Sequence, residues 1–132
     1  MHSDIAGQEY LYTTVIPVLL DGDATAGKIA RDMYLRHEIT AHWFGYKRGI
    51  SLWGCSKCHR LPCAVTDMSD TLLLQILLDF AKEQSGLLVL YPCSPAAEAF
   101  ILRRAKALES CFVIQRIPEV GDPLFPLVLK ND

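Results

Sequence analysis

Strand and helix patterns alternate along this chain from about residue 14 to residue 117, and this alternation constrains the fold more than any other feature. Residues 14–20 and 87–91 are apolar almost throughout, which is typical of strands that are covered on both faces. Strands that alternate with helices form a mostly parallel sheet between helical layers. We therefore predict an α/β protein, a Rossmann-like three-layer sandwich with a mostly parallel sheet of about five strands.

The individual elements are predicted from apolar periodicity and from turn and capping residues. Strands are expected at residues 14–20, 39–44, 62–66, 87–91 and 111–117, and helices at 25–37, 70–84 and 95–108. Ser69 or Asp70 is expected to cap the second helix and Ser94 the third, with Pro95 at its first position. Residues 45–61 lack a steady period and are interpreted as a long loop with at most a short element. Pro17 is expected to bulge or interrupt the first strand, because proline cannot donate to a ladder.

The 132 residues correspond to one ordinary domain, with an N-terminal extension at 1–13, the domain itself at 14–117 and a proline-rich tail or linker at 118–132. Thirteen basic and fifteen acidic residues leave a net charge of -2, which argues against nucleic acid or an anionic membrane as partner. No apolar run approaches the roughly 20 residues of a membrane span. The first residues do not follow the pattern of a secretory signal, so a cytoplasmic location is expected.

The turn after the first predicted strand is the principal candidate ligand site. Ligands of open parallel sheets bind beyond the carboxyl ends of the strands, and here the first such turn contains Asp21, Gly22 and Asp23. Gly22 permits a tight turn or a close approach by a ligand, and the free amides of a helix start favour an anion. The turn matches neither the dinucleotide-binding pattern nor the phosphate loop, and two aspartates would repel a phosphate. A simple capping role for either aspartate is the alternative.

Residues 17–23, followed by residues 27–31, resemble the start of the N-terminal pre-ATP-grasp domain of ATP-grasp carboxylate–amine ligases. Residues 87–94, then 97–100 and Leu108, are similar to the later strand, proline turn and helix of that family. With the order of elements, the resemblance extends over about residues 14–117. It implies a Rossmann-like domain that precedes the ATP-grasp domains, which bind ATP and Mg²⁺ and join a carboxylate to an amine through an acyl phosphate.

The resemblance also implies that the first turn and the end of the later strand face a cleft between domains and form its substrate side. The ligand-binding residues implied in this way are Asp21, Gly22, Asp23, Ala24, Pro92, Cys93 and Ser94. No catalytic residue is assigned, and no cofactor is expected on this domain alone, since ATP and Mg²⁺ would bind the absent ATP-grasp domain. Many relatives carry an acidic residue after the proline turn, where this chain has Ser94 and Pro95.

The leading hypothesis is therefore a substrate-side domain that is not catalytic alone, because the residues after Pro118 are too few for nucleotide-binding lobes. The expected partners are an ATP-grasp domain in the full-length chain, a small-molecule substrate such as an amino acid, and a second copy in a homodimer. A free-standing module that binds a small ligand or a nucleotide through the same turn is the second hypothesis.

Residues 53–63 contain the spacing C-x-x-C-H at Cys55, Cys58 and His59, followed by Cys63. These four side chains are the candidate ligands of a zinc site, and Cys55 with Cys58 is a candidate redox pair whose thiol pKa neighbouring basic residues would lower. Covalent haem attachment would require export. Adjacent Cys58 and His59 point in different directions, so incidental thiols in a solvated loop are the preferred interpretation. A zinc or thiol redox protein is the third hypothesis.

Five basic or titratable side chains make the same part of the chain locally basic: Lys47, Arg48, Lys57, His59 and Arg60. Such a segment suits an anionic ligand or an acidic neighbouring domain, but a solvated loop is the preferred interpretation. Trp43 and Trp53 are expected to pack, with Trp53 also able to close over a ligand.

Overall fold

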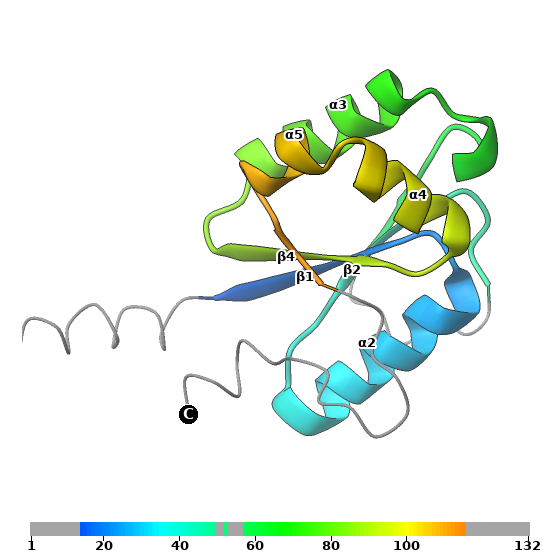
Figure 1. Cartoon of the computed structure of the whole chain (residues 1–132). Coiled ribbons are helices and arrows are strands. Elements are labelled where there is room, and N and C mark those ends of the chain that lie inside the picture. Colours follow the sequence, from blue (N-terminus) through cyan, green and yellow to red (C-terminus); the bar gives the residue numbers. More distant parts are fainter. Residues whose placement is uncertain (1–13, 50–51, 53–56, 116–132) are drawn as a thin grey trace, which may run out of the picture.

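The computed structural model of the chain describes residues 14–49, 52 and 57–115. In this part five parallel strands form one sheet with the order β3-β2-β1-β4-β5. The strands are β1 (Val15–Leu20), β2 (His42–Gly45), β3 (Lys57–Arg60), β4 (Leu87–Pro92) and β5 (Val113–Ile114). Helix α2 (Asp23–His37) lies on one face of the sheet, and α3 (Asp70–Lys82), α4 (Pro95–Arg103) and α5 (Ala105–Glu109) lie on the other (Figure 1).

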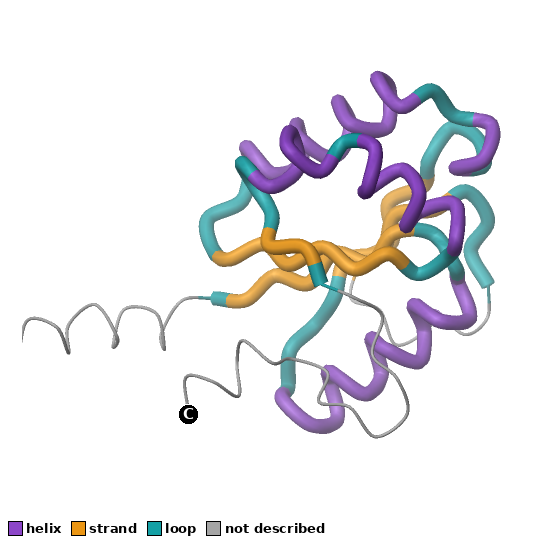
Figure 2. The backbone as a smooth tube through the Cα atoms, in the orientation of Figure 1, coloured by secondary structure: helices purple, strands orange, loops and turns teal. Residues whose placement is uncertain are grey.

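This arrangement confirms the predicted Rossmann-like three-layer sandwich, whose layers are seen edge-on in Figure 2. Neighbouring residues of a strand point to opposite faces, so each strand supplies both layers of the core. Leu19 and Val89 pack with α2, whereas Val18 and Leu90 pack with the helices of the other face. The sheet is therefore apolar on both faces, as the continuous apolar runs of β1 and β4 predict.

Strand β1 is continuous through Pro17, so the predicted bulge or interruption is wrong. The carbonyls of Thr14 and Leu20 accept from the amides of Leu87 in β4 and of Cys93 just after it, and Asp21 donates its amide to the carbonyl of Phe44 in β2. Backbone groups alternate along a strand, so Pro17 presents its nitrogen to the β2 side. Pairing with β2 begins only at Val18, so no ladder bond is lost at the proline.

The second and third strands differ from the sequence prediction. Strand β2 begins at His42 rather than at residue 39, because Glu38 is left-handed (φ 56°) and Ile39 donates its amide back to Met33 in the end of α2. The third strand is β3, inside the segment interpreted as a loop. Residues 62–66 instead enter a short 3-10 helix, Val65–Asp67. Strand β3 lies at the edge of the sheet, with exposed residues at both ends and partly buried ones between them, so it carries no apolar run by which to recognise it.

Helix starts follow the predicted caps more closely than helix ends. Ser69 accepts from the amide of Leu72 and caps α3, and Ser94 accepts from Ala97 and caps α4. The predicted helix 95–108 is broken in two at Arg104, which has φ -118° and ψ 25°. The apolar positions on both sides of the break still face the sheet, so periodicity alone does not reveal it.

The predicted N-terminal extension at 1–13 and the tail at 118–132 lie outside the described residues. Of the helices in the described part, none has both the length and the apolar character needed to cross a membrane.

Candidate functional site

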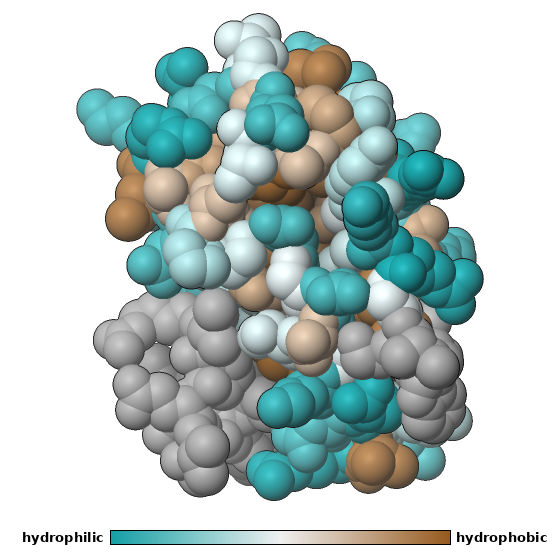
Figure 3. Space-filling model, turned by 90° about the vertical axis from the view of Figure 1, so that its right-hand side faces the viewer, coloured by the Kyte–Doolittle hydropathy of each residue, from teal (hydrophilic) through white to brown (hydrophobic). Residues whose placement is uncertain are grey.

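The candidate site lies at the carboxyl ends of β1 and β4, the two strands at the centre of the sheet. From β1 the chain continues into α2 on one face, and from β4 it continues into α4 on the other face (Figure 1). Connections that leave neighbouring strands to opposite faces open a crevice between them. Figure 3 shows the molecule from the side on which these strands end. Hydrophilic and near-neutral surface predominates there.

Two consecutive left-handed residues form the turn that leaves β1. Asp21 has φ 63° and Gly22 has φ 51°. At Gly22 a Cβ atom would overlap the backbone carbonyl of Cys93, so only glycine fits between the two strand ends. Asp21 is one of the few residue types that tolerate this conformation, at a cost of about 1 kcal/mol relative to glycine.

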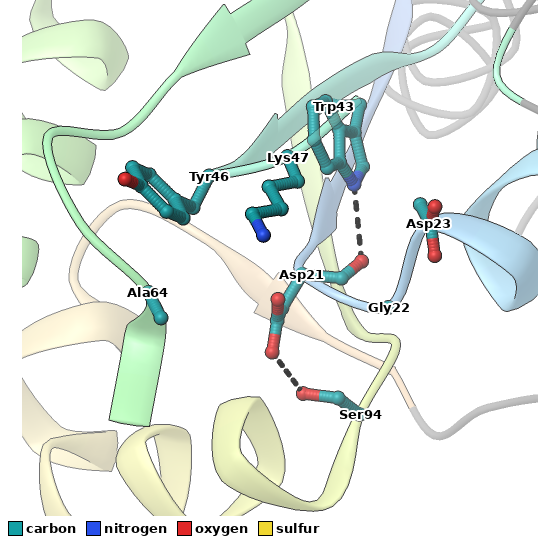
Figure 4. Close-up of a pocket in the computed structure, with 8 residues that line it drawn as sticks. All are labelled: Asp21, Gly22, Asp23, Trp43, Tyr46, Lys47, Ala64 and Ser94. Carbon is teal, nitrogen blue, oxygen red and sulfur yellow. Dashed lines mark hydrogen bonds between the residues drawn. The ribbon is translucent and has the colours of Figure 1, made fainter. Parts of the chain in front are cut away.

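A hydrogen bond between Ser94 and Asp21 joins the ends of the two central strands. Oγ of Ser94 donates to Oδ2 of Asp21 over 2.6 Å and accepts from the amide of Ala97 over 3.1 Å (Figure 4). The hydroxyl therefore caps α4 and positions the Asp21 carboxylate at the same time. Oδ1 of Asp21 has no hydrogen-bond partner within residues 14–49, 52 and 57–115.

Ser94→Ala is expected to lower the free energy of unfolding by about 2 kcal/mol, because both a helix cap and a bond to a carboxylate are lost. Ser69→Ala is the matched control: Ser69 also caps a helix, and removing that cap should cost about 1 kcal/mol. Urea unfolding of the two variants measures the difference. Equal losses would mean that the contact with Asp21 contributes nothing to stability.

A cavity of about 530 Å³ opens in front of this bridge. Its walls are Asp21, Gly22, Asp23, Trp43, Tyr46, Lys47, Ala64 and Ser94 (Figure 4). The indole of Trp43 is held in place because its Nε1 donates to the carbonyl of Asp21 over 3.0 Å. The cavity thus presents carboxylates and an ammonium group beside an aromatic wall, within the range of volumes of small-molecule sites.

The seven residues implied by the resemblance fall into two groups. Asp21, Gly22, Asp23 and Ser94 line the cavity. Cys93 and Pro92 are buried, and Ala24 is exposed on the first turn of α2; these three are not among the lining residues. The carbonyl of Cys93 nevertheless shapes the site by its close approach to Gly22.

The capping alternative would require one aspartate of the turn to be the N-cap of α2, but neither occupies that position. The cap position is Gly22, which has no side chain, and helix α2 begins at Asp23, two residues before the predicted start. Oδ1 of Asp23 accepts from the amide of Ala24, so it serves one free donor of the first turn.

The sequence patterns predict a packing role for Trp43 and a basic loop around Lys47, and they single out neither Tyr46 nor Ala64. Trp43 lies on β2, and Tyr46 and Lys47 directly follow it. Their position after a strand was the available signal, since parallel strands end at one edge. Ala64 gave no such signal, because residues 62–66 were predicted to be a strand.

The described members of the candidate zinc set do not converge. Cys58 and His59 are neighbours on β3; Cys58 packs with the α2 layer, whereas His59 contacts Phe44 and Phe80 in the other layer. Cys63 packs against that second layer. Among the described residues no group of three or more His, Cys, Asp or Glu side chains is placed to hold a metal ion. Cys55, and with it the candidate redox pair and haem pattern, lies outside them.

His59 pairs with His42 in an aromatic cluster on the face of the sheet opposite α2. Nδ1 of His42 lies 2.9 Å from Nε2 of His59, and the ring of His59 stacks on Phe44 at 4.3 Å between centroids. Burial, His59 and Lys57 lower the pKa of His42 from 6.5 to about 4, and burial and Lys57 lower the pKa of His59. A donor–acceptor pair of rings requires that at least one ring be neutral.

The unfolding free energy is therefore expected to decrease as the pH falls from 6.5 to about 4, by about 1–2 kcal/mol once solvent screening of the half-buried rings is allowed for. In that pH window the unfolded chain binds more protons than the folded one, so stability is lost as the pH falls. Above pH 6.5 the neutral histidine pair makes its full contribution to the free energy of unfolding. Urea unfolding at a series of pH values measures the slope. The double variant His42→Gln with His59→Gln should flatten it, and an unchanged slope would contradict the assignment.

Comparison of the chain with protein-family models, with curated proteins and with solved structures finds no match.

Proposed function

We propose that this chain is a small-molecule binding domain that forms the substrate side of an ATP-dependent carboxylate–amine ligase and does not catalyse alone. The cavity in front of the Asp21–Ser94 bridge is the observation that carries the binding role, because open α/β sheets bind ligands where their connections diverge. The ligase role rests on the resemblance of residues 14–117 to the pre-ATP-grasp domain.

The cavity walls suit a small zwitterion such as an amino acid. Oδ2 of Asp21 is bonded to Ser94, which leaves Oδ1 available for an ammonium group. The side chain of Lys47 points into the same space and offers a positive charge to a carboxylate (Figure 4). Trp43 and Tyr46 form an aromatic part of the wall of the same cavity.

The hydrogen bonds of Ser94 favour a role in ligand binding over a role as a nucleophile. The Ser94 hydroxyl donates to Asp21 and accepts from Ala97, so it both positions the Asp21 carboxylate and caps α4. Attack by this hydroxyl would cost the helix α4 its cap and the Asp21 carboxylate its positioning bond.

The binding role is tested by calorimetry and thermal unfolding with the twenty amino acids. At least one is expected to bind and to raise the melting temperature, since a ligand that binds only the folded state stabilises it. Asp21→Asn keeps an acceptor for Ser94 but removes the charge, and it should weaken binding about 10-fold. Asp67→Asn, which changes an exposed aspartate of the 3-10 helix, is the matched control. Absence of binding across the panel would refute the binding role.

The ligase role has separate tests. The isolated chain should not hydrolyse ATP in response to an amino acid, and turnover by these residues alone would overturn the proposal of a non-catalytic domain. In the gene, the coding sequence beyond Asp132 is expected to encode ATP-grasp lobes. Amino-acid binding combined with a stop codon at that point would instead favour a free-standing binding module.

A further inference from the structure

A second cavity, of about 540 Å³, adjoins the one beside Asp21 and shares Trp43, Tyr46 and Lys47 with it. Its other lining residues in the described part are Arg48, Cys58 and Arg60. The two cavities therefore share a wall at the carboxyl edge of the sheet, and together they are called the trough. Aspartates line the end near β1 and β4, and arginines line the end near β2 and β3.

Parallel pairing of β2 with β3 gathers the cations at the second cavity. Gly45 is in register with Arg60, and the amide of Leu61 bonds to the carbonyl of Gly45 over 2.8 Å. Lys47 and Arg48 follow β2 within three residues, so they leave the sheet beside the end of β3. Trp43 and Cys58 are partners in the same register, which places the floor of the cavity in the α2 layer.

These cations have no acidic partners among the described residues. Lys47, Arg48 and Arg60 make no ion pair there, and no carboxylate from the described part of the chain lines this cavity. Elsewhere the chain pairs its arginines: Arg103 and Arg104 both contact Asp70. Cζ of Arg60 lies 5.8 Å from the centre of the Tyr46 ring, within the range of a cation–π contact that limits its rotamers.

We propose that the second cavity is an anion subsite, which binds an oxyanion group of the small molecule whose amine is held at Asp21. Guanidinium groups match the oxygens of phosphate and carboxylate in pairs, and unpaired cations in a partly enclosed cavity bind such groups without first breaking an ion pair. The inference rests on the proposed binding role and adds the class of ligand: an amine that carries a phosphate or a second carboxylate.

The central comparison is between L-serine and O-phospho-L-serine, which differ only in the phosphate group, and L-glutamate adds a second carboxylate. Isothermal titration at low ionic strength uses L-serine, O-phospho-L-serine, L-glutamate and inorganic phosphate as probes. O-phosphoserine or glutamate is expected to bind at least about 10-fold more tightly than serine, and the tighter of the two identifies the oxyanion. Added salt should weaken the anionic probes more than serine. A response to heparin without a response to any of these probes would overturn the inference, because it indicates a surface for polyanions.

Arg48→Gln and Arg60→Gln remove charge from the second cavity and leave the walls of the first unchanged. Each is expected to weaken the binding of the anionic probe about 10-fold and to leave the binding of serine unchanged. Arg60→Lys should keep part of the higher affinity for the anionic probe. Lys106→Gln, which changes an exposed residue of α5, is the control, and thermal unfolding confirms that each variant is folded.

The two proposals fail in different ways. The anion subsite would be overturned if serine and its phosphate ester bound equally well and neither arginine variant changed their affinity. The binding role at Asp21 would remain in place. Phosphate binding that depends on Arg60 but not on Asp21, without binding of any amine, would support the subsite and refute the amine site.

Discussion

Gly22→Ala is expected to lower the free energy of unfolding by about 2–4 kcal/mol, although it adds only one methyl group. Two causes add. The residue has φ 51°, which disfavours any side chain, and the new Cβ would overlap the carbonyl of Cys93. Because that carbonyl belongs to the backbone at the end of β4, relief requires the two central strand ends to separate. Urea unfolding followed by circular dichroism measures the loss.

Gly49→Ala is the matched control for this substitution. Its Cβ would meet the carboxylate of Asp23, the end of a side chain that can rotate, and its φ is not in the left-handed region. The expected loss of stability is below about 1 kcal/mol. Equal stability of Gly22→Ala and wild type would show that the strand ends are not packed as described, and the geometry of the cavity would have to be revised.

Replacement of Trp43 is expected to have the second large effect, because the indole is 2% exposed and belongs to both cavities. Trp43→Ala should lower the unfolding free energy by about 3–5 kcal/mol through loss of buried area. Trp43→Phe should lower it by about 2 kcal/mol, mainly because the carbonyl of Asp21 loses its donor. Chemical unfolding in urea, with fixed m-values, is the measurement.

Leu77→Ala separates the stability of Trp43 variants from their effect on binding. Leu77 is fully buried in the layer opposite α2, and its truncation should cost about 2–5 kcal/mol without altering the trough. Under conditions in which all variants are folded, only the Trp43 variants are expected to lose affinity for the small-molecule probes. Equal affinity of Trp43→Phe and wild type would contradict the place of the indole in the ligand site.

Under the proposed function, the trough would select its ligand by the charges at its two ends. Its two ends carry opposite charge, and Trp43, Tyr46 and Lys47 are common to both cavities. A ligand with an amine at one end and an oxyanion at the other satisfies both, whereas a ligand with one charged group leaves the other end to water. Selectivity of this kind depends on the spacing of the strand ends, which the sheet holds rigidly.

Local sequence patterns determined the layers of this fold. The apolar runs of β1 and β4 predicted central strands, and Ser69 and Ser94 marked the starts of two helices. Edge elements were harder to predict. Strand β3 has the sequence KCHR and is only half covered, so its pairing with β2 leaves no trace in the hydropathy of the segment.

The same distinction applies to the candidate site. The sequence by itself determined that Asp21, Gly22 and Asp23 form a turn at the end of a buried strand, because the apolar run stops there and glycine permits φ 51°. Only the tertiary structure decided what that turn faces. Ser94 lies 73 residues away along the chain, and Arg60 reaches the trough through the pairing of β3 with β2. Local periodicity specifies which face of a strand is buried, whereas the order of strands depends on long-range packing that no short segment contains.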